Sequence, residues 1–165
     1  MRLHILYSLL GFMLLVPLAH AAGTPEHVRL GTATPGGGFQ LFGQHLAEVI
    51  TASDCSLHVE AIATRGSTQN LADLEAGKID IGLVEGNAAR VALEGIDRKP
   101  SGLKVLSVMY PNPGMFVVRA ESPYQRIDDL KGKPIAFGTR ASGLRILARD
   151  VLNGLGPVSY THLTL

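Results

Sequence analysis

Residues 31–43 read GTATPGGGFQLFG, and this stretch sets the expected fold of the N-terminal half. Three consecutive glycines lie between the apolar residues 28–30 and a segment of helical spacing that begins at Phe39. Glycine in such a loop costs backbone entropy, so we expect the position to need unusual dihedral angles or the close approach of another group. We therefore predict a strand over residues 28–32, a glycine loop, and a helix over residues 39–50.

The same alternation of elements continues downstream. Residues 57–62 alternate apolar and polar side chains, as a strand does, and residues 79–84 form a third apolar run. Between them we predict a helix that Ser67 or Thr68 caps at its start, because a hydroxyl accepts a hydrogen bond from a free amide there. Gly77 is expected to end this helix in a left-handed conformation.

The order strand, helix, strand, helix, strand over residues 28–84 implies a parallel sheet with right-handed crossovers. In sheets of this kind, ligands bind outside the carboxyl ends of the strands. Three loops rich in Gly, Ser, Thr or Asn are expected to meet at that edge: residues 32–38, 64–68 and 85–87.

The pattern becomes weaker after residue 87. We predict further helices over residues 88–93 and 144–151, strands over 103–110, 115–119 and 134–137, and one helical turn over 127–130. A second strand-loop-helix unit thus begins near Lys133. One strand and one helix cannot bury that helix, so either these elements join the first sheet or the chain is a fragment of a two-domain protein.

The first 21 residues have the layout of a secretory signal peptide. Met1 and Arg2 give a positive start, residues 5–18 are almost wholly apolar, and Ala19-His20-Ala21 matches a small-x-small cleavage site. The alternative is a membrane anchor, but about 14 apolar residues are fewer than the roughly 20 that span a bilayer. We expect cleavage after Ala21 and a periplasmic location.

Composition excludes several classes of protein. The chain of 165 residues is 46% hydrophobic and 18% charged, with a net charge of +1, so no basic excess points to a nucleic-acid partner. Cys55 is the only cysteine, which rules out an internal disulfide, and we expect it to be a small buried thiol. The six histidines have no metal-binding spacing, so we expect neither a metal nor a cofactor.

The glycine loop allows two interpretations. It lacks the Gly-Lys-Ser/Thr of a phosphate-binding loop and the pattern of a dinucleotide-binding loop. The loop is either a tight turn that lets helix and sheet pack closely, or a seat for an anion at a helix N-terminus. Ser67 and Ser142 lie in no Gly-x-Ser-x-Gly elbow, and no nucleophile-base set is present. The chain therefore favours a binding protein over an enzyme.

Arg65 and Arg140 each lie in a loop at a helix entrance. The planar guanidinium suits bidentate capture of a carboxylate, and the alternative is a solvated surface arginine. Glu85 follows the third predicted strand, where it either accepts an ammonium group from a ligand or interacts with a helix dipole.

Three long segments carry a resemblance to a known family: residues 31–43, residues 65–89 (RGSTQNLADLEAGKIDIGLVEGNAA) and residues 103–152. In order and spacing, roughly over residues 28–155, they resemble the TAXI group. These are the solute-binding proteins of tripartite ATP-independent periplasmic (TRAP) transporters. Binding proteins of ABC importers share segments such as LEAGKIDIGLV and DLKGKPIAFG, and remain the alternative.

The resemblance implies an α/β, two-lobed fold like that of type II periplasmic binding proteins, closing on a ligand. The first lobe would be residues 22–119, with residues 115–119 crossing between lobes, and residues 120–156 would begin the second. Family members are roughly twice as long, so we expect a truncated second lobe. Residues 157–165 depart from the family pattern and form an atypical tail.

The implied function is an extracytoplasmic receptor, a monomer, that captures a small organic anion such as an amino acid or dicarboxylate. It would deliver the anion to membrane permease subunits. The family typically has a small polar residue and then an aromatic residue after the glycines, whereas this chain has Gly38 and Phe39. The residues that match the family's cleft-lining loops by position are Gly36, Gly37, Gly38, Phe39, Ser67, Thr68, Glu85, Asn87, Thr139, Arg140, Ala141, Ser142 and Gly143.

Overall fold

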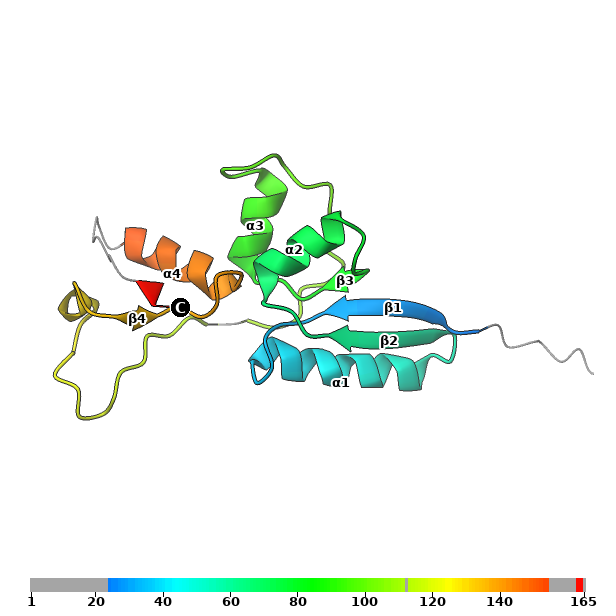
Figure 1. Cartoon of the computed structure of the whole chain (residues 1–165), viewed down its shortest axis with the longest axis horizontal. Helices are drawn as coiled ribbons and strands as arrows, with labels where there is room; N and C mark the ends of the chain where they lie inside the picture. Colours follow the sequence, from blue (N-terminus) through cyan, green and yellow to red (C-terminus); the bar gives the residue numbers. More distant parts are fainter. Residues whose placement is uncertain (1–23, 112, 155–162, 165) are drawn as a thin grey trace, which may run out of the picture.

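The computed structural model describes residues 24–111, 113–154 and 163–164 (Figure 1). The predicted signal peptide and most of the predicted tail lie outside these residues. The elements are β1 (Glu26–Gly31), α1 (Gly38–Ser53), β2 (Leu57–Ile62), α2 (Ser67–Glu75), β3 (Ile81–Gly82), α3 (Gly86–Glu94), the 3-10 turn η1 (Ile127–Leu130), β4 (Ile135–Ala136), α4 (Gly143–Gly154) and β5 (Leu163–Thr164).

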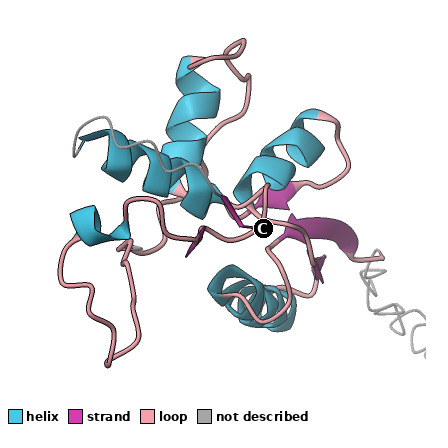
Figure 2. Cartoon of the chain, turned by 60° about the vertical axis from the view of Figure 1, so that its left-hand side comes forward, coloured by secondary structure: helices cyan, strands magenta, loops and turns pink. Residues whose placement is uncertain are grey.

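The first sheet has the strand order β2-β1-β3, and all of its pairs are parallel. The register pairs Glu26 with Leu57 and Gly31 with Ile62 along β2, and Leu30 with Ile81 along β3. This confirms the strand-helix-strand-helix-strand order predicted over residues 28–84. Helix α1 covers one face of the sheet and α2 and α3 lie on the other side, as Figures 1 and 2 show.

The main core lies between α1 and the sheet. Leu30 and Val59 from the strands and Leu83, which follows β3 directly, pack with Ala47 of α1, and aromatic and aliphatic side chains of α1 surround them. Helix α1 approaches β1 closely at Gly43, where an added Cβ would lie 2.4 Å from Thr32 Cγ2. The two buried residues of β1, Leu30 and Gly31, lie at the end of the strand, and in β2 the buried Val59 lies between the exposed His58 and Glu60.

Two smaller clusters hold the remaining helices. Leu71 of α2 packs with Ala88 and Ala92 of α3, and a separate cluster joins Phe137 to Ala148 and Leu152 of α4. Strand β4 pairs in parallel with β5 in a second sheet of two strands, so the strand predicted at 134–137 does not join the first sheet. The division into lobes at residues 22–119 and 120–156 stays a prediction.

Two predicted strands are absent from the described residues. Residues 103–110 and 115–119 carry apolar side chains, but the segment is irregular and pairs with no strand in the described part of the chain. Leu106 is 80% exposed, Val108 89% and Val117 84%. The prediction was wrong because apolar residues make a strand only where a neighbouring strand accepts their backbone hydrogen bonds. Cys55 also differs from its prediction, since it is exposed at the turn before β2.

The left-handed end of α2 is confirmed. Gly77 has φ of +66°, its amide donates to Leu74 O, and the Lys78 amide donates to Asp73 O at 2.8 Å. These two bonds satisfy carbonyls that the helix end leaves free, and only glycine takes this conformation without a Cβ penalty.

An ion pair fastens this turn to β1. Arg29 Nε and Nη2 donate to the two Asp80 carboxylate oxygens at 2.9 and 2.8 Å, and Nη2 also donates to Gly77 O at 3.0 Å. The side-chain hydrogen bonds from Arg29, together with its backbone amide, lower the pKa of Asp80 from 3.8 to about 2.

We expect the Asp80 pair to make stability depend on pH in the acid range. Because the pKa of Asp80 is lower in the folded chain, its stabilising contribution is present above about pH 3.8 and is lost as pH falls toward about 2. Asp80→Asn should therefore be less stable than the parent at pH 5, with the difference vanishing near pH 2. Urea unfolding at a series of pH values measures this. The exposed Asp128→Asn is the control, and an Asp80→Asn deficit that persists at pH 2 would contradict the assignment.

Candidate functional site

Loops from both halves of the described chain meet at the carboxyl ends of the first sheet. We call this region the loop junction, and it consists of residues 64–68, 83–87 and 138–143. The first two segments follow β2 and β3 and lead into α2 and α3, and the third connects β4 to α4. Parallel strands end at one edge of a sheet, which is why the first two segments are neighbours.

The loop before α4 is hydrogen-bonded to the start of α2. The Thr68 amide donates to Ala141 O at 3.0 Å, and Thr139 Oγ1 donates to Arg65 O at 2.8 Å. Gly66 lies against this loop with φ of +113°, and a Cβ added to it would lie 3.2 Å from Ser142 Cα. These contacts fix the positions of Thr139, Ala141 and Ser142 of the predicted site relative to the start of α2.

Gly143 closes the same junction against α3. An added Cβ at Gly143 would lie 2.6 Å from Glu85 Cβ and 2.7 Å from Ser67 Oγ. Ser67 Oγ in turn accepts a hydrogen bond from the Glu85 amide at 3.0 Å. The first turn of α2, the turn before α3 and the start of α4 therefore meet at Ser67, Glu85 and Gly143.

The predicted cap of α2 is wrong. Gly66 is the N-cap residue, and it makes no side-chain capping bond. Ser67 is already the first helical residue, and its buried hydroxyl binds the Glu85 amide instead of an amide of its own helix. Ser67 does lie at the helix start, as predicted, but the amide that its hydroxyl binds is 18 residues away in sequence.

Glu85 caps α3 with its own carboxylate, which accepts bonds from the Asn87 and Ala88 amides, each at 3.1 Å. Of the two roles predicted for Glu85, the interaction with a helix start is the one seen. Because the Glu85 carboxylate already accepts hydrogen bonds from the N-terminal amides of α3, this helix start is not an open binding site for a second anion.

A family comparison gives the context of this junction. The family model described as the NMT1-like family matches residues 30–165. The chain belongs to the NMT1-like family. This is a family of periplasmic solute-binding type, and its members are typically extracytoplasmic. Membership supports a role as a solute-binding receptor with a small-molecule ligand and membrane transporter partners. The mixed α/β structure with its small parallel sheet is compatible with a periplasmic-binding-like fold.

The glycine loop of this NMT1-like chain is open. Gly36 has φ of +81°, and Gly37 caps α1 without a side-chain bond. The Gln40 amide donates to Gly37 O at 3.1 Å, whereas the Gly38 and Phe39 amides have no backbone acceptor among the described residues. Cβ atoms added to Gly36 or Gly38 would meet nothing within 4 Å. Phe39 packs edge-on against Tyr110, with ring centroids 6.4 Å apart. Gly36 thus allows the left-handed turn, Gly37 is the N-cap residue of the helix, and no neighbouring side chain occupies the space beside Gly36 and Gly38.

The structure brings the predicted site residues into two groups. Arg65, Ser67, Thr68, Glu85, Thr139, Ala141, Ser142 and Gly143 contact one another in the loop junction. The glycine loop is linked to them through its neighbours, because the Thr64 amide donates to Ala33 O at 3.2 Å. Arg140 is exposed, and Arg65 is held along α2, where its Nε donates to Gln69 Oε1 at 3.1 Å.

Asn70 is a positioning residue that the sequence analysis missed. Its side chain is 0% exposed, and Nδ2 lies 3.2 Å from Gly31 O, 2.7 Å from Thr32 O and 2.8 Å from Leu83 O. It therefore joins α2 to the ends of β1 and β3, where two loops of the site begin. A polar residue directly beside the inward-facing Leu71 was the signal that could have revealed it.

Two cavities adjoin α4 and share Phe137 and Ala148 as lining residues. The larger, about 800 Å³, is lined by residues 114–119 together with apolar side chains of β4 and α4. The smaller, about 410 Å³, is lined by Thr68, Arg140 and Ser142 of the predicted site and by Arg145 and Arg149 of α4. The sequence analysis did not name Arg145 and Arg149 as site residues. They are four residues apart in α4, and this spacing places both side chains on one face of the helix.

Two further properties hold for the described residues. No three metal-ligating side chains gather into a cluster within residues 24–111, 113–154 and 163–164. Over the same ranges, no helix combines the length and apolar character needed to cross a bilayer.

Proposed function

We propose that the chain is an extracytoplasmic receptor of the TAXI type, which binds a small organic anion in the loop junction and passes it to a TRAP permease. The observation that carries this proposal is the meeting of the β2–α2, β3–α3 and β4–α4 loops at the carboxyl edge of the parallel sheet. The proposed role is binding and release by a monomer, with no bond made or broken in the ligand.

Charge supports an anion as the ligand. Arg65 and Arg140 lie in loops of the junction, and each can offer a planar pair of donors to a carboxylate. The α1 amides beside the glycine loop add a second attraction for negative charge. Each oxygen of the Glu85 carboxylate accepts one amide hydrogen bond from α3. A contact with the ammonium group of an amino-acid ligand would use the remaining lone pairs of these oxygens.

The partner follows from the transporter type. Genes for two permease subunits without an ATPase beside the gene for this chain would support the TRAP assignment. A neighbouring ATPase gene would instead support the alternative, an ABC importer.

We expect a thermal-shift screen to identify the ligand class. A carboxylate at about 100 times its Kd should raise the Tm by roughly 5–10 °C, because binding to the folded state alone stabilises it. The corresponding neutral amides should not. Arg140→Ala should weaken binding of the best carboxylate by about 10- to 100-fold, the usual loss for a charged hydrogen bond.

The exposed Arg126→Ala is the matched control and should bind like the parent. If Arg140→Ala binds as tightly as the parent, the role of Arg140 is wrong. If amides and carboxylates give equal shifts, the ligand is not recognised as an anion.

A further inference from the structure

The smaller cavity has an unusual distribution of charge. We call it the arginine pocket, and it is defined by Arg140, Arg145 and Arg149 together with Thr68, Phe137 and Leu152. Its volume is about 410 Å³, and none of its lining residues is acidic. Phe137 and Leu152 are buried and form an apolar wall, whereas the arginines come from the β4–α4 loop and from one face of α4.

Arg145 is fixed in place but incompletely bonded. Its Nη1 donates to Arg140 O at 3.1 Å, which ties the guanidinium to the loop before α4. Its Nε is buried and has no hydrogen-bond partner within residues 24–111, 113–154 and 163–164. A buried donor on a cationic group is costly when it is left unpaired, so it marks a place where an acceptor is missing.

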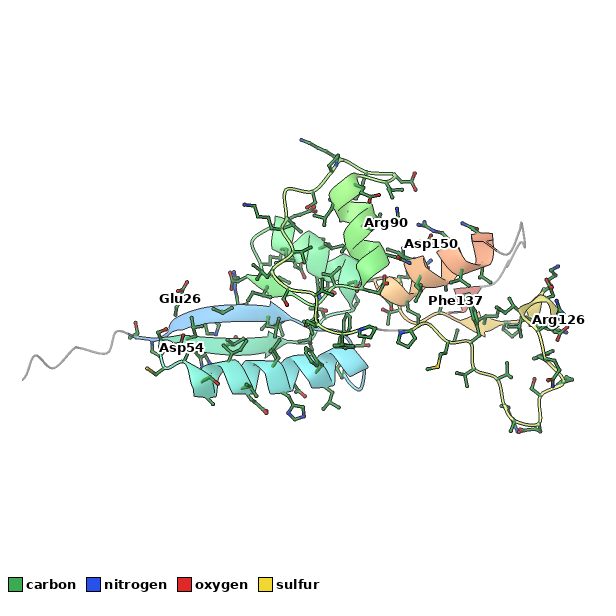
Figure 3. The ribbon with its side chains drawn as sticks, turned by 180° about the vertical axis from the view of Figure 1, so that it is seen from behind. Glu26, Asp54, Arg90, Arg126, Phe137 and Asp150 are labelled. Carbon is green, nitrogen blue, oxygen red and sulfur yellow. The ribbon has the colours of Figure 1, made fainter. Side chains whose placement is uncertain are left out.

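No carboxylate in the part of the chain that the structure describes supplies that acceptor. Among the described residues, neither Arg140 nor Arg145 forms a salt bridge. Arg149 Nε lies 3.6 Å from Asp150 Oδ1, but Asp150 also faces Arg90 Nη2 of α3 at 3.9 Å, as Figure 3 shows for the two labelled residues. The pocket therefore has an excess of positive charge beside an apolar wall.

We infer that the arginine pocket binds the oxyanion group of a small organic anion, with Arg145 as its main contact and Phe137 against the apolar part of the ligand. The inference rests on the proposed function and deepens it, because it places the anionic group on α4 side chains beside the loop junction. A guanidinium group can donate two parallel hydrogen bonds to the oxygens of either a carboxylate or a phosphate, so both groups are candidates.

The test observes the Nε–H group of Arg145 directly by ¹⁵N NMR on the full chain. The Arg145 resonance is assigned as the one that is missing from the spectrum of the Arg145→Lys variant. Succinate and inorganic phosphate are titrated separately, with chloride at matched ionic strength as the reference. We expect at least one of the two oxyanions to shift the Arg145 resonance in a saturable manner, and chloride to leave it in place. The oxyanion that saturates identifies the source of the group.

Calorimetry with the saturating oxyanion supplies the second measurement. Arg145→Gln should weaken its binding at least about tenfold, whereas Arg126→Gln, which removes an exposed arginine outside the pocket, should not. If Arg145→Gln fails to fold, the NMR titration of the parent still decides. An Arg145 resonance that neither oxyanion shifts overturns the inference.

The failures of the two proposals are distinguishable. If a carboxylate from the thermal-shift screen binds the parent while the Arg145 resonance stays in place, the receptor role stands and the arginine pocket is wrong. If an oxyanion saturates Arg145 but no organic solute is retained by the protein, the pocket stands and the receptor role is wrong.

Discussion

Asn70→Ala is expected to lower the free energy of unfolding by about 2–4 kcal/mol. The two N–H bonds of the Asn70 amide serve three carbonyl oxygens, those of Gly31, Thr32 and Leu83, so one donor is shared. Alanine would leave these buried acceptors without that donor and would open a cavity between α2 and the sheet. Urea unfolding followed by circular dichroism measures the change.

Asn153→Ala is the control for this prediction. Asn153 is exposed near the end of α4, so its replacement should change stability by no more than about 0.5 kcal/mol. Asn70→Asp should be worse than Asn70→Ala, because an ionised carboxylate cannot donate to the carbonyls and would be buried unpaired. A loss for Asn70→Ala no larger than that of the control would show that Asn70 does not hold the strand ends together.

Gly143→Ala is expected to separate the loop before α4 from α2 and α3. The new methyl group would lie 2.6 Å from Glu85 Cβ, which moves only with the backbone before α3, and 2.7 Å from Ser67 Oγ, which can rotate away only by giving up its bond to the Glu85 amide. The expected cost is about 1–3 kcal/mol, as for other overpacked positions. Because the displaced loop carries Thr139 and Arg140, affinity for the solute should fall at least about tenfold in calorimetry.

Gly154→Ala is the matched control. Gly154 is the last residue of α4, outside the loop junction, and a Cβ added there would meet nothing within 4 Å. Alanine is the better helix former, so this variant should be at least as stable as the parent and bind equally well. If Gly143→Ala keeps the affinity of the parent, the close contact at Gly143 is not needed to shape the site.

Features that depend on local sequence could be predicted. The alternation of residues 57–62, the helical spacing after Phe39 and the left-handed Gly77 are each set by neighbours in the chain, and each is confirmed. The parallel order then followed from topology, because short strands joined by helices leave few other arrangements. The same reasoning placed the loops 64–68 and 85–87 at one edge of the sheet.

Features that depend on distant partners could not be predicted. Ser67 binds the amide of Glu85, 18 residues away, and Asn70 binds carbonyls at the ends of β1 and β3, 13 to 39 residues away. Nothing in the residues around each one specifies that partner. The prediction of strands within residues 103–119 was wrong for a related reason. Apolar residues in a segment do not indicate whether a second strand lies beside it.

The most direct test of the account is to ask what the protein retains from a mixture of solutes. The purified full chain is dialysed against a mixture of amino acids, dicarboxylates, keto acids and their neutral amides, and the retained solute is released and weighed by mass spectrometry. We predict one organic anion, retained at one per chain and recovered chemically unchanged. Retention of a neutral amide in preference to every anion, recovery of an altered product, or no retained solute would contradict the account.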